Sequence, residues 1–243
     1  MSRTNFSTYM AIKSKLIQTF KTETFEKNKL PSEPVLAKRL GISLVTLRES
    51  LLMLALEGYI TKRHGSGNYV HKSALDYENR SFYFFENFRR QGLTPSHKLL
   101  SQEYIPADEK ISNMLGLPKG ASVLYNRILY TADDHPAVYS RGHIPVELLV
   151  REDVENMTFE LVHELLWSFC RREVAHALNE YRPVCADEEI AGYLKIAPGT
   201  PIIYGEQVFH DIHDEPLLFS YQYFHPDYYS IRTLQNWDLN QPV

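Results

Sequence analysis

The stretch LPSEPVLAKRLGISLVTLRESLLMLALEGYITKRHGSGNYVH, residues 30–71, decides the fold of the N-terminal part of the chain. Its first half predicts a short helix that begins after Ser32, because a serine hydroxyl can cap the N–H groups of a first turn. Pro34 fits in that first turn, where its missing N–H would have had no partner. The helix is expected to run to Leu40 and to end at Gly41.

A second helix is predicted after a three-residue turn. Ser43 is placed to cap it, and the buried side from Leu44 to Glu57 is expected to carry Leu47, Leu51, Leu54 and Ala55. Two capped helices joined by a tight turn predict a helix-turn-helix, whose second helix enters the DNA major groove. The exposed side chains at its start are Leu44, Val45, Thr46 and Arg48. Arg48 is the leading candidate for a base or phosphate contact, because its planar guanidinium fits both; the alternative is that it pairs with a nearby acidic residue.

The stretch closes with a predicted β-hairpin. Residues 60–63 alternate like a strand, residues 64–67 form a turn that needs positive φ, and residues 68–70 return. The tip is glycine-rich and flanked by basic residues, so its backbone can approach phosphates or a narrow groove. The residues predicted to contact DNA are Ser32, Ser43, Thr46, Arg48, Lys62, Arg63, His64, Gly65, Gly67 and Asn68.

Charge is distributed unevenly along the chain. Residues 1–72 hold 12 Lys and Arg against 5 Asp and Glu, and the remainder holds 14 against 25, so a net charge of +7 is followed by one of −11. This asymmetry is expected when only the first module approaches phosphates; chance variation of surface charge is the alternative. Apolar residues at helical spacing predict one more helix in this basic module, over residues 7–22, with a stripe of Tyr9, Ile12, Leu16 and Phe20.

Length and composition fit two globular domains. The 243 residues contain no apolar run that approaches the roughly 18 residues of a membrane span. The first 20 residues lack a signal-peptide pattern, so a cytoplasmic protein is expected. Cys170 and Cys185 are too few for a disulfide framework, and both are expected to be small buried residues.

The C-terminal part contains an internal repeat. ADEKISNMLGLPKGASVLYNRILYTADDHPAVYS, residues 107–140, matches ADEEIAGYLKIAPGTPIIYGEQVFHDIHDEPLLFS, residues 186–220, at an offset of 79 and, toward the end, of 80. Each copy predicts a strand, a short helix capped near its acidic start, a Pro-Gly turn and a long hairpin. The two hairpins can pair into one antiparallel sheet with helices on one face and a ligand-binding cleft between the halves.

A linker is predicted between the two modules, over residues 73–90. Its aromatic residues are expected to pin it to the second domain, although an exposed surface for a partner is the alternative. These residues are Phe82, Phe84, Phe85 and Phe88.

The first module resembles the winged helix-turn-helix of GntR-family transcriptional regulators, through the runs LPSE, LAKRLGIS, VTLR and LEGYI and the GSGNYV hairpin. The repeat resembles the effector-binding UTRA domain of the HutC subfamily, a relative of the chorismate lyase fold. The resemblance implies an α+β chain: a winged helix-turn-helix over 1–72, the linker 73–90, and over 91–243 an antiparallel sheet with helices and an internal pseudo-repeat. It further implies a homodimeric repressor that binds double-stranded operator DNA under the control of a small-molecule effector. From the residues themselves, no cofactor, metal or membrane association is expected.

Two positions depart from the GntR pattern. The family usually has an arginine directly after LPSE and another directly after the turn serine, whereas this chain has Pro34 and Leu44. The loss of two cationic contacts is expected to flatten the salt dependence of DNA binding, since each phosphate contact contributes a slope of roughly 0.9.

Candidates for the effector site fall into two sets, because successive residues of a strand face opposite sides. Sugar-phosphate-binding relatives have an Arg-x-Arg pair aligned with Ile128 and Tyr130, an acidic residue aligned with Ser140, and serines aligned near Phe159 and Glu160. None of these groups is preserved, and Glu160 at a helix start would repel an anion, so a ligand other than a simple sugar phosphate is expected. The first set is Asn126, Ile128, Tyr130, Ser140, Glu160, Leu218, Ser220 and Phe224. A register shifted by one residue replaces it with Arg127, Arg141, Glu206 and Tyr221.

Two other functions compete with ligand-controlled DNA binding. A lyase-type enzyme would need cationic and acidic groups on its substrate, for which Arg127, Arg141 and Glu206 could serve. No nucleophile–base spacing, HExxH-type metal motif or phosphate-binding glycine motif accompanies them, so no catalytic residue is predicted. The second competitor is a DNA-binding protein without a ligand, against which the repeat and its cleft argue.

Overall fold

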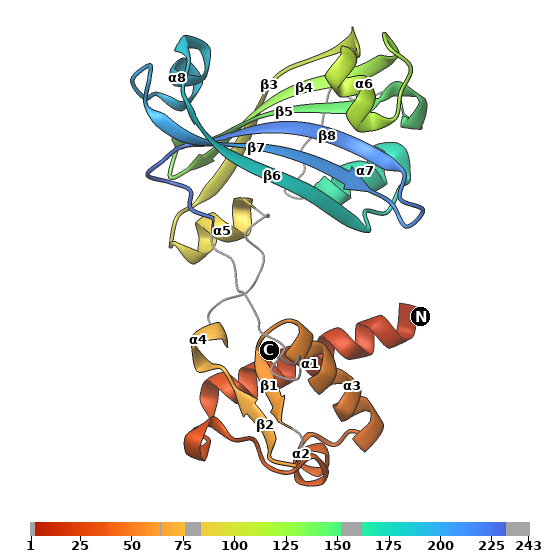
Figure 1. Cartoon of the computed structure of the whole chain (residues 1–243), viewed down its shortest axis with the longest axis vertical. Helices are drawn as coiled ribbons and strands as arrows, with labels where there is room; N and C mark the ends of the chain where they lie inside the picture. The colour runs from red at the N-terminus through yellow and green to blue at the C-terminus, as the bar shows by residue number, and fades with distance from the viewer. Residues whose placement is uncertain (1–2, 64, 76–83, 152–161, 232–243) are drawn as a thin grey trace, which may run out of the picture. The chain divides into compact units, whose positions relative to one another are not determined.

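The protein is described by a computed structural model that covers residues 3–63, 65–75, 84–151 and 162–231, with the backbone alone for residues 3–10. The chain divides into two compact units (Figure 1), with the described residues up to Leu75 in the first and those from Phe84 to Ile231 in the second. None of the helices in the described part is both long and apolar enough to cross a membrane.

The first unit consists of helices followed by a hairpin. In chain order its elements are α1 (Arg3–Thr22), η1 (Glu26–Asn28), α2 (Glu33–Leu40), α3 (Leu44–Leu56), β1 (Ile60–Arg63), β2 (Gly67–Val70) and α4 (Lys72–Leu75). The core brings together the predicted apolar stripes, including Leu16, Phe20, Leu36, Leu47, Leu51 and Leu54, each at most 1% exposed. The winged helix-turn-helix fold is therefore confirmed, while the Tyr9 side chain lies outside the described residues.

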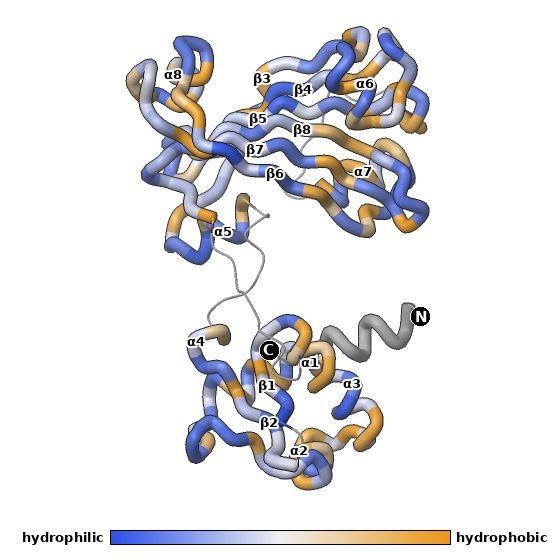
Figure 2. The backbone as a smooth tube through the Cα atoms, viewed as in Figure 1, coloured by the Kyte–Doolittle hydropathy of each residue, from blue (hydrophilic) through white to orange (hydrophobic). Residues whose placement is uncertain are grey.

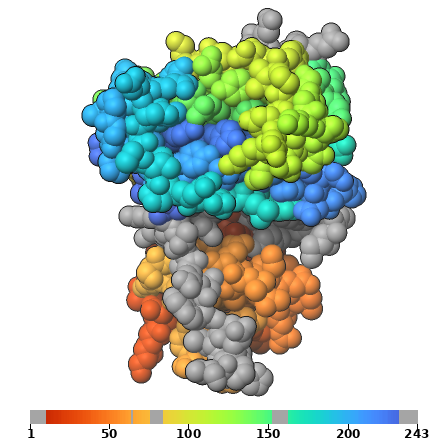
Figure 3. All heavy atoms as spheres, turned by 45° about the horizontal axis from the view of Figure 1, so that its top comes forward, coloured from red at the N-terminus to blue at the C-terminus, as the bar shows by residue number. Residues whose placement is uncertain are grey.

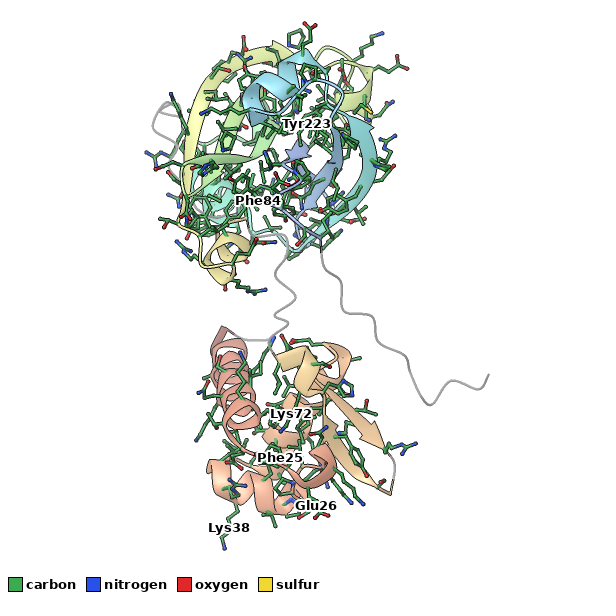
Figure 4. The ribbon with its side chains drawn as sticks, turned by 90° about the vertical axis from the view of Figure 1, so that its left-hand side faces the viewer. Phe25, Glu26, Lys38, Lys72, Phe84 and Tyr223 are labelled. Carbon is green, nitrogen blue, oxygen red and sulfur yellow. The ribbon has the colours of Figure 1, made fainter. Side chains whose placement is uncertain are left out.

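The ends of the predicted linker pack on the two units. Ala74 and Leu75 of α4 are 2% and 3% exposed in the core of the first unit. Helix α5 (Phe84–Arg90) packs on the second unit, where the Phe84 ring lies 4.8 Å from the Tyr130 ring and points to the sheet in Figure 4. Phe85 and Phe88 are also buried there, as predicted, and Phe82 lies outside the described residues.

The second unit is built on one six-stranded antiparallel sheet with the order β3-β4-β5-β8-β7-β6. The strands are β3 (Pro95–Pro106), β4 (Ser122–Ala132), β5 (His135–Pro145), β6 (His176–Cys185), β7 (Pro201–His210) and β8 (Pro216–Phe224). The helical elements are α6 (Glu109–Leu115), η2 (Val146–Leu148), α7 (Val162–Cys170) and α8 (Glu188–Leu194).

The internal repeat forms the two halves of this sheet. The first copy is β3, α6, β4 and β5, and the second is β6, α8, β7 and β8; they meet where β5 pairs with β8. Asp108 and Asp187 cap the two helices in the same way, since each carboxylate accepts a 2.8 Å hydrogen bond from the third residue after it. The predicted strand–helix–hairpin unit is therefore present twice.

Helices cover both faces of the sheet, although the sequence predicted them on one. On the α6/α8 face, Ile111 of α6 and Ile190 of α8 pack against the strands. On the α5/α7 face, Phe88 of α5 and Leu166 of α7 do so. Figure 2 shows hydrophobic residues gathered on α7 and the adjoining strand ends. The repeat could not reveal α5 and α7, because both lie outside its two copies.

The two cysteines differ in environment. Cys170 at the end of α7 is 3% exposed, as predicted, and burial raises the pKa of its thiol to about 11. Cys185 is exposed, so the prediction of a buried residue was wrong. It ends β6, an edge strand of the sheet, where no neighbouring strand covers one side.

Candidate DNA-binding face and effector site

The recognition helix of the first unit begins as predicted. Ser43 Oγ accepts a 3.0 Å hydrogen bond from the backbone N–H of Thr46, and the two hydroxyls lie 2.7 Å apart. Leu44 packs partly on the core, whereas Val45 is 65% exposed. Val45 and Arg48 thus stand outward on the helix that is predicted to enter the major groove, where an aliphatic group can contact thymine methyls.

Glu33, at the start of α2, connects the recognition helix to the wing. Arg48 donates from Nε to Glu33 at 2.7 Å, Lys62 Nζ lies 3.8 Å away, and the Asn68 amide donates at 3.5 Å. The Arg48 hydrogen bond lowers the pKa of the Glu33 carboxyl, and the contributions of Asn68 and Lys62 help to outweigh the opposing effect of burial. The alternative predicted for Arg48, an acidic partner, is therefore present, although it lies 15 residues earlier in the chain.

The ion pair with Glu33 does not remove Arg48 from the surface. Its side chain is 59% exposed, and one bond through Nε uses one of the five N–H donors of a guanidinium. Glu33 therefore positions Arg48 at the start of the recognition helix while the fork of Nη donors is left for base or phosphate contacts.

An open groove of about 1030 Å³ separates the start of α2 from the wing. Lys29, Ser32, Lys62 and Arg63 line it together with Gly65 and Gly67. Both glycines have positive φ, +69° and +110°, as the predicted turn requires, and a Cβ on Gly67 would lie 3.3 Å from Lys29. The groove thus has basic residues on both sides, and at the wing the two glycines add a stretch without side chains.

Of three further predicted DNA contacts, the structure describes Ser32 and Asn68. Ser32 occupies the N-cap position of α2, but its side chain makes no capping bond, so the predicted cap was wrong. The Asn68 side chain is 6% exposed and donates to Glu33, which places it inside the wing. His64 lies outside the described residues.

The two predicted effector sets lie on opposite faces of the sheet. Ile128 is paired with Ser140 on the α5/α7 face. The other described members of the first set occupy every second position of their strands and lie on the same face. Leu218 and Phe224 are 6% and 1% exposed within two separate apolar clusters there. Tyr130 packs against Phe84 of α5. Glu160 lies outside the described residues.

Between these apolar clusters lie buried polar side chains that bond to one another. Gln222 donates at 2.7 Å to Gln207, which in turn donates to Asn179. Ser220 and Asn126 are 4% exposed, and Asn126 fills the space above Gly142, where a Cβ would lie 2.6 Å from its Oδ1. Sequence reasoning missed Gln207 and Gln222. Each directly follows a predicted residue of the second set, Glu206 or Tyr221, and strand alternation could therefore have placed both on the face of the first set.

The second set forms a single row across the α6/α8 face. Arg127 lies opposite Arg141, Arg141 opposite Tyr221, and Tyr221 opposite Glu206. Ser101 continues the row on β3. The four candidates were predicted to share a face, and the pairing of four strands brings them side by side.

Glu206 is held by three donors. Lys110 of α6, Arg182 of β6 and the Tyr204 hydroxyl all bond to Oε1, at 2.5, 2.7 and 2.7 Å. Burial alone would raise the pKa of Glu206, but the hydrogen bonds from Lys110 and Tyr204 and the charges of Lys110 and Arg182 outweigh it and lower the pKa. Glu206 is therefore an ionised carboxylate whose charge is already neutralised.

The two arginines of the row have hydroxyl partners instead. Arg127 donates from Nε to Ser101 at 2.6 Å and from Nη1 to Tyr193 at 3.4 Å. Arg141 donates to the Tyr223 hydroxyl, and its guanidinium carbon lies 4.9 Å from the centre of that ring. Tyr223 lies among the strands of the second unit in Figure 4. Burial raises the pKa of Tyr221, the next residue of the row, to about 12, so its hydroxyl stays protonated.

Comparison with known families identifies both units. The family model described as bacterial regulatory proteins, gntR family, matches residues 8–70, and that of the UTRA domain matches residues 90–230. This chain is a GntR-family transcriptional regulator with a UTRA domain. The combination defines the HutC subfamily.

Named relatives of the regulator span most of its length. The repressor NagR of Bacillus subtilis is 28% identical over 175 residues, which is 72% of each chain. The uncharacterised regulator YurK of the same organism is 28% identical over 191 residues and 78% of each chain. MngR of Escherichia coli, a repressor of a mannosyl-D-glycerate transport and metabolism system, is 24% identical over 72% of each chain.

Solved structures share the fold of the regulator. The possible transcriptional regulator YydK of Bacillus subtilis has a TM-score of 0.77 at 17% identity, covering 94% of this chain and 99% of that one. PhnF of Mycobacterium smegmatis has a TM-score of 0.55 at 16% identity, covering 93% and 99%.

The competing prediction of an enzyme is not supported. The relatives are transcriptional regulators rather than enzymes, and the regulator is one of them. Among the described residues, no group of three or more His, Cys, Asp or Glu is arranged to hold a metal ion.

Proposed function

We propose that the regulator is a repressor that binds a pseudo-palindromic operator as a homodimer in the cytoplasm and releases it when a small molecule binds the UTRA domain. The observation that carries the DNA-binding half is the Glu33 cluster. It joins α2, the recognition helix and the wing through Arg48, Lys62 and Asn68. These are the elements that a winged helix-turn-helix presents to DNA.

The basic groove supports this assignment. Lys29, Lys62 and Arg63 line it beside the exposed Ser32, and Glu33 is the acidic residue among its lining side chains. Contacts from these groups to phosphates would release counterions and position the recognition helix. Because Pro34 and Leu44 stand where the family has arginine, the wing and Arg48 carry a larger share of the binding.

The sign of regulation is proposed from the relatives. NagR and MngR are described as repressors, and both align with more than two thirds of this chain. For a repressor, an effector needs to change the affinity for DNA by a coupling of about 1–3 kcal/mol, or roughly 5- to 150-fold. A coupling of this size requires a difference in effector affinity between the DNA-bound and released states.

Selection of genomic fragments by the full-length protein tests the proposal. We expect enrichment of sequences with two half-sites separated by about one helical turn, and a complex that contains two chains per fragment. Enrichment without sequence preference, or a complex with one chain, would contradict the homodimeric operator-binding function.

A further inference from the structure

We propose that the effector carries an oxyanion group, such as a carboxylate or phosphoryl group, and that Arg127 and Arg141 bind it on the α6/α8 face of the sheet. The inference deepens the proposed function and rests on it, because it names the site and the chemistry of the effector. It does not concern the α5/α7 face, where the sequence aligned the phosphate-binding positions of relatives.

The first observation is the close approach of two like charges. Arg127 and Arg141 are directly opposite each other on β4 and β5, and such pairs are destabilising unless something compensates them. Their bonds are to Ser101, Tyr193 and Tyr223, which are all neutral hydroxyls.

The second observation is the missing carboxylate. Within the described part of the chain, neither guanidinium forms an ion pair, and buried Arg141 Nε has no hydrogen-bond partner. Arg182 and Arg172 show the contrast, since they reach Glu206 at 2.7 Å and Asp211 at 3.3 Å. Partly buried cations are normally paired, so an anion from outside the chain fits this pair.

The third observation comes from the repeat. Arg127 corresponds to Glu206 at the offset of 79, and Arg141 to Tyr221 at 80, so the first half of the row is cationic and the second is not. Lys110 corresponds in the same way to Glu189. Lys110 crosses to neutralise Glu206, whereas the exposed Glu189 has no ion pair among the described residues. The second half is therefore neutralised from within the protein and the first half is not.

The α6/α8 face, to which the arginine pair belongs, is hollowed between its two helices. In Figure 3 the atoms of β7 and β8 lie at the bottom of a hollow whose rim is made by the segments of α6 and α8. Tyr193 of α8 and Tyr223 of β8 bring phenol groups to this face, and the fully buried Tyr139 stacks on Tyr193 at 4.3 Å and lies beside Tyr223. Phenol hydroxyls and guanidinium forks are donors suited to an oxyanion, and the rings suit a planar body attached to it.

The opposite face offers less to an anion. Its polar side chains include the amides of Gln222, Gln207 and Asn179, which bond to one another. The aligned positions Ile128, Tyr130 and Ser140 carry no charge. An anion bound there would have no cationic partner among them.

Thermal unfolding of the full-length protein with benzoate, inorganic phosphate and the neutral benzamide tests the proposal at constant ionic strength. The variants are Arg127→Gln and Arg141→Gln, with Arg172→Gln as the matched control because Arg172 is paired with Asp211 and does not belong to the row. We expect at least one of the two anions to stabilise the wild type and Arg172→Gln equally. The two row variants should bind that anion roughly ten- to a hundredfold more weakly, as expected for the loss of a charge-assisted bond.

Glu189→Gln tests whether removal of a negative charge changes anion affinity in the opposite direction to removal of an arginine. Glu189 belongs to α8, whose segment forms part of the rim of the hollow in Figure 3. Burial is the largest cause of the raised pKa of Tyr125 and Tyr139, and the charge of Glu189 adds to it. Its removal should tighten binding of the anion, whereas a merely structural role of the arginines predicts no change.

The outcomes distinguish a failure of the proposed anion site from a failure of the proposed operator-binding function. Phosphate also stabilises proteins by exclusion from their surface, but that effect would be the same in every variant. Equal shifts in the wild type and the three arginine variants, or no shift with either anion, would overturn the proposal. Failure of the wild type to bind any operator would instead contradict the proposed function, and the comparison of variants would still decide the site. Benzoate and phosphate serve as separate arms that distinguish a carboxylate from a phosphoryl group.

Discussion

At the scale of single residues, one carboxylate organises the DNA-binding face. Arg48 and Lys62 come from the recognition helix and the wing, and both reach Glu33. The cluster fixes the direction of Arg48 without burying it, because the side chain remains 59% exposed. Specific binding should therefore depend on Arg48 more than on its neighbours.

Replacement of Arg48 by alanine is expected to cost about 1–3 kcal/mol in specific operator binding, the usual value of a bidentate base contact. Fluorescence anisotropy with a labelled operator measures this loss. Arg172→Ala is the control, since it removes an ion-paired arginine from the other unit. A loss of less than about 1 kcal/mol would assign base recognition to another residue.

The Glu33 cluster should also make stability depend on pH. The pKa of Glu33 in the folded protein is below its ordinary value of 4.5, chiefly through the Arg48 hydrogen bond. Its contribution is therefore present above that value and is lost as the pH falls through the lowered pKa. We expect the wild type to melt at a higher temperature than Glu33→Gln at neutral pH, and the difference to shrink in acid. A difference that grows on acidification would contradict this assignment.

At the scale of elements, the short helix α4 belongs to the DNA-binding unit. Leu75 is 3% exposed and Ala74 is 2% exposed in the same core as Leu16 and Leu54 of α1 and α3. Four residues after the wing therefore complete the head, although the sequence predicted a linker from residue 73 onward. A lone apolar pair after a strand carries no periodicity by which it could be recognised.

Two fragments of the head test the role of α4. One ends at His71 and the other at Leu75, and the longer should be more stable by about 1.5–3 kcal/mol, the value of burying a leucine. Urea unfolding followed by circular dichroism measures the difference. The exposed Lys72→Ala in the longer fragment is the control, and equal midpoints for the two fragments would show that α4 contributes nothing.

At the scale of the whole molecule, the distribution of charge separates DNA binding by the first unit from effector binding by the second. The net charge of +7 lies in the first 72 residues and the −11 lies in the rest. The sheet of the second unit nevertheless holds two arginines on one face that form no ion pair with any described residue. DNA phosphates repel an acidic unit, and the local positive charge of its two arginines is available to a small anion.

Coupling between the units gives the prediction at this scale. An oxyanion that binds the full-length protein should weaken operator binding by roughly 5- to 150-fold. The fragment that ends at Leu75 should bind DNA more weakly and show no response to the same anion. Operator titrations with and without the anion measure both quantities. A response retained by the fragment would place the effector in the head.

The sequence by itself determined the local structure and the pairing of the two copies of the internal repeat. Caps at Ser43, Asp108 and Asp187, the wing glycines and the repeat all act over a few residues or by self-similarity, so they could be read without coordinates. Alternation also showed which strand residues share a face. Only the tertiary structure decided which face is covered by α5 and α7, because those helices lie outside the repeat. It alone brought Glu33 to Arg48 across 15 residues and aligned Arg127, Arg141 and Glu206 in one row, since contacts between distant segments depend on packing and strand register.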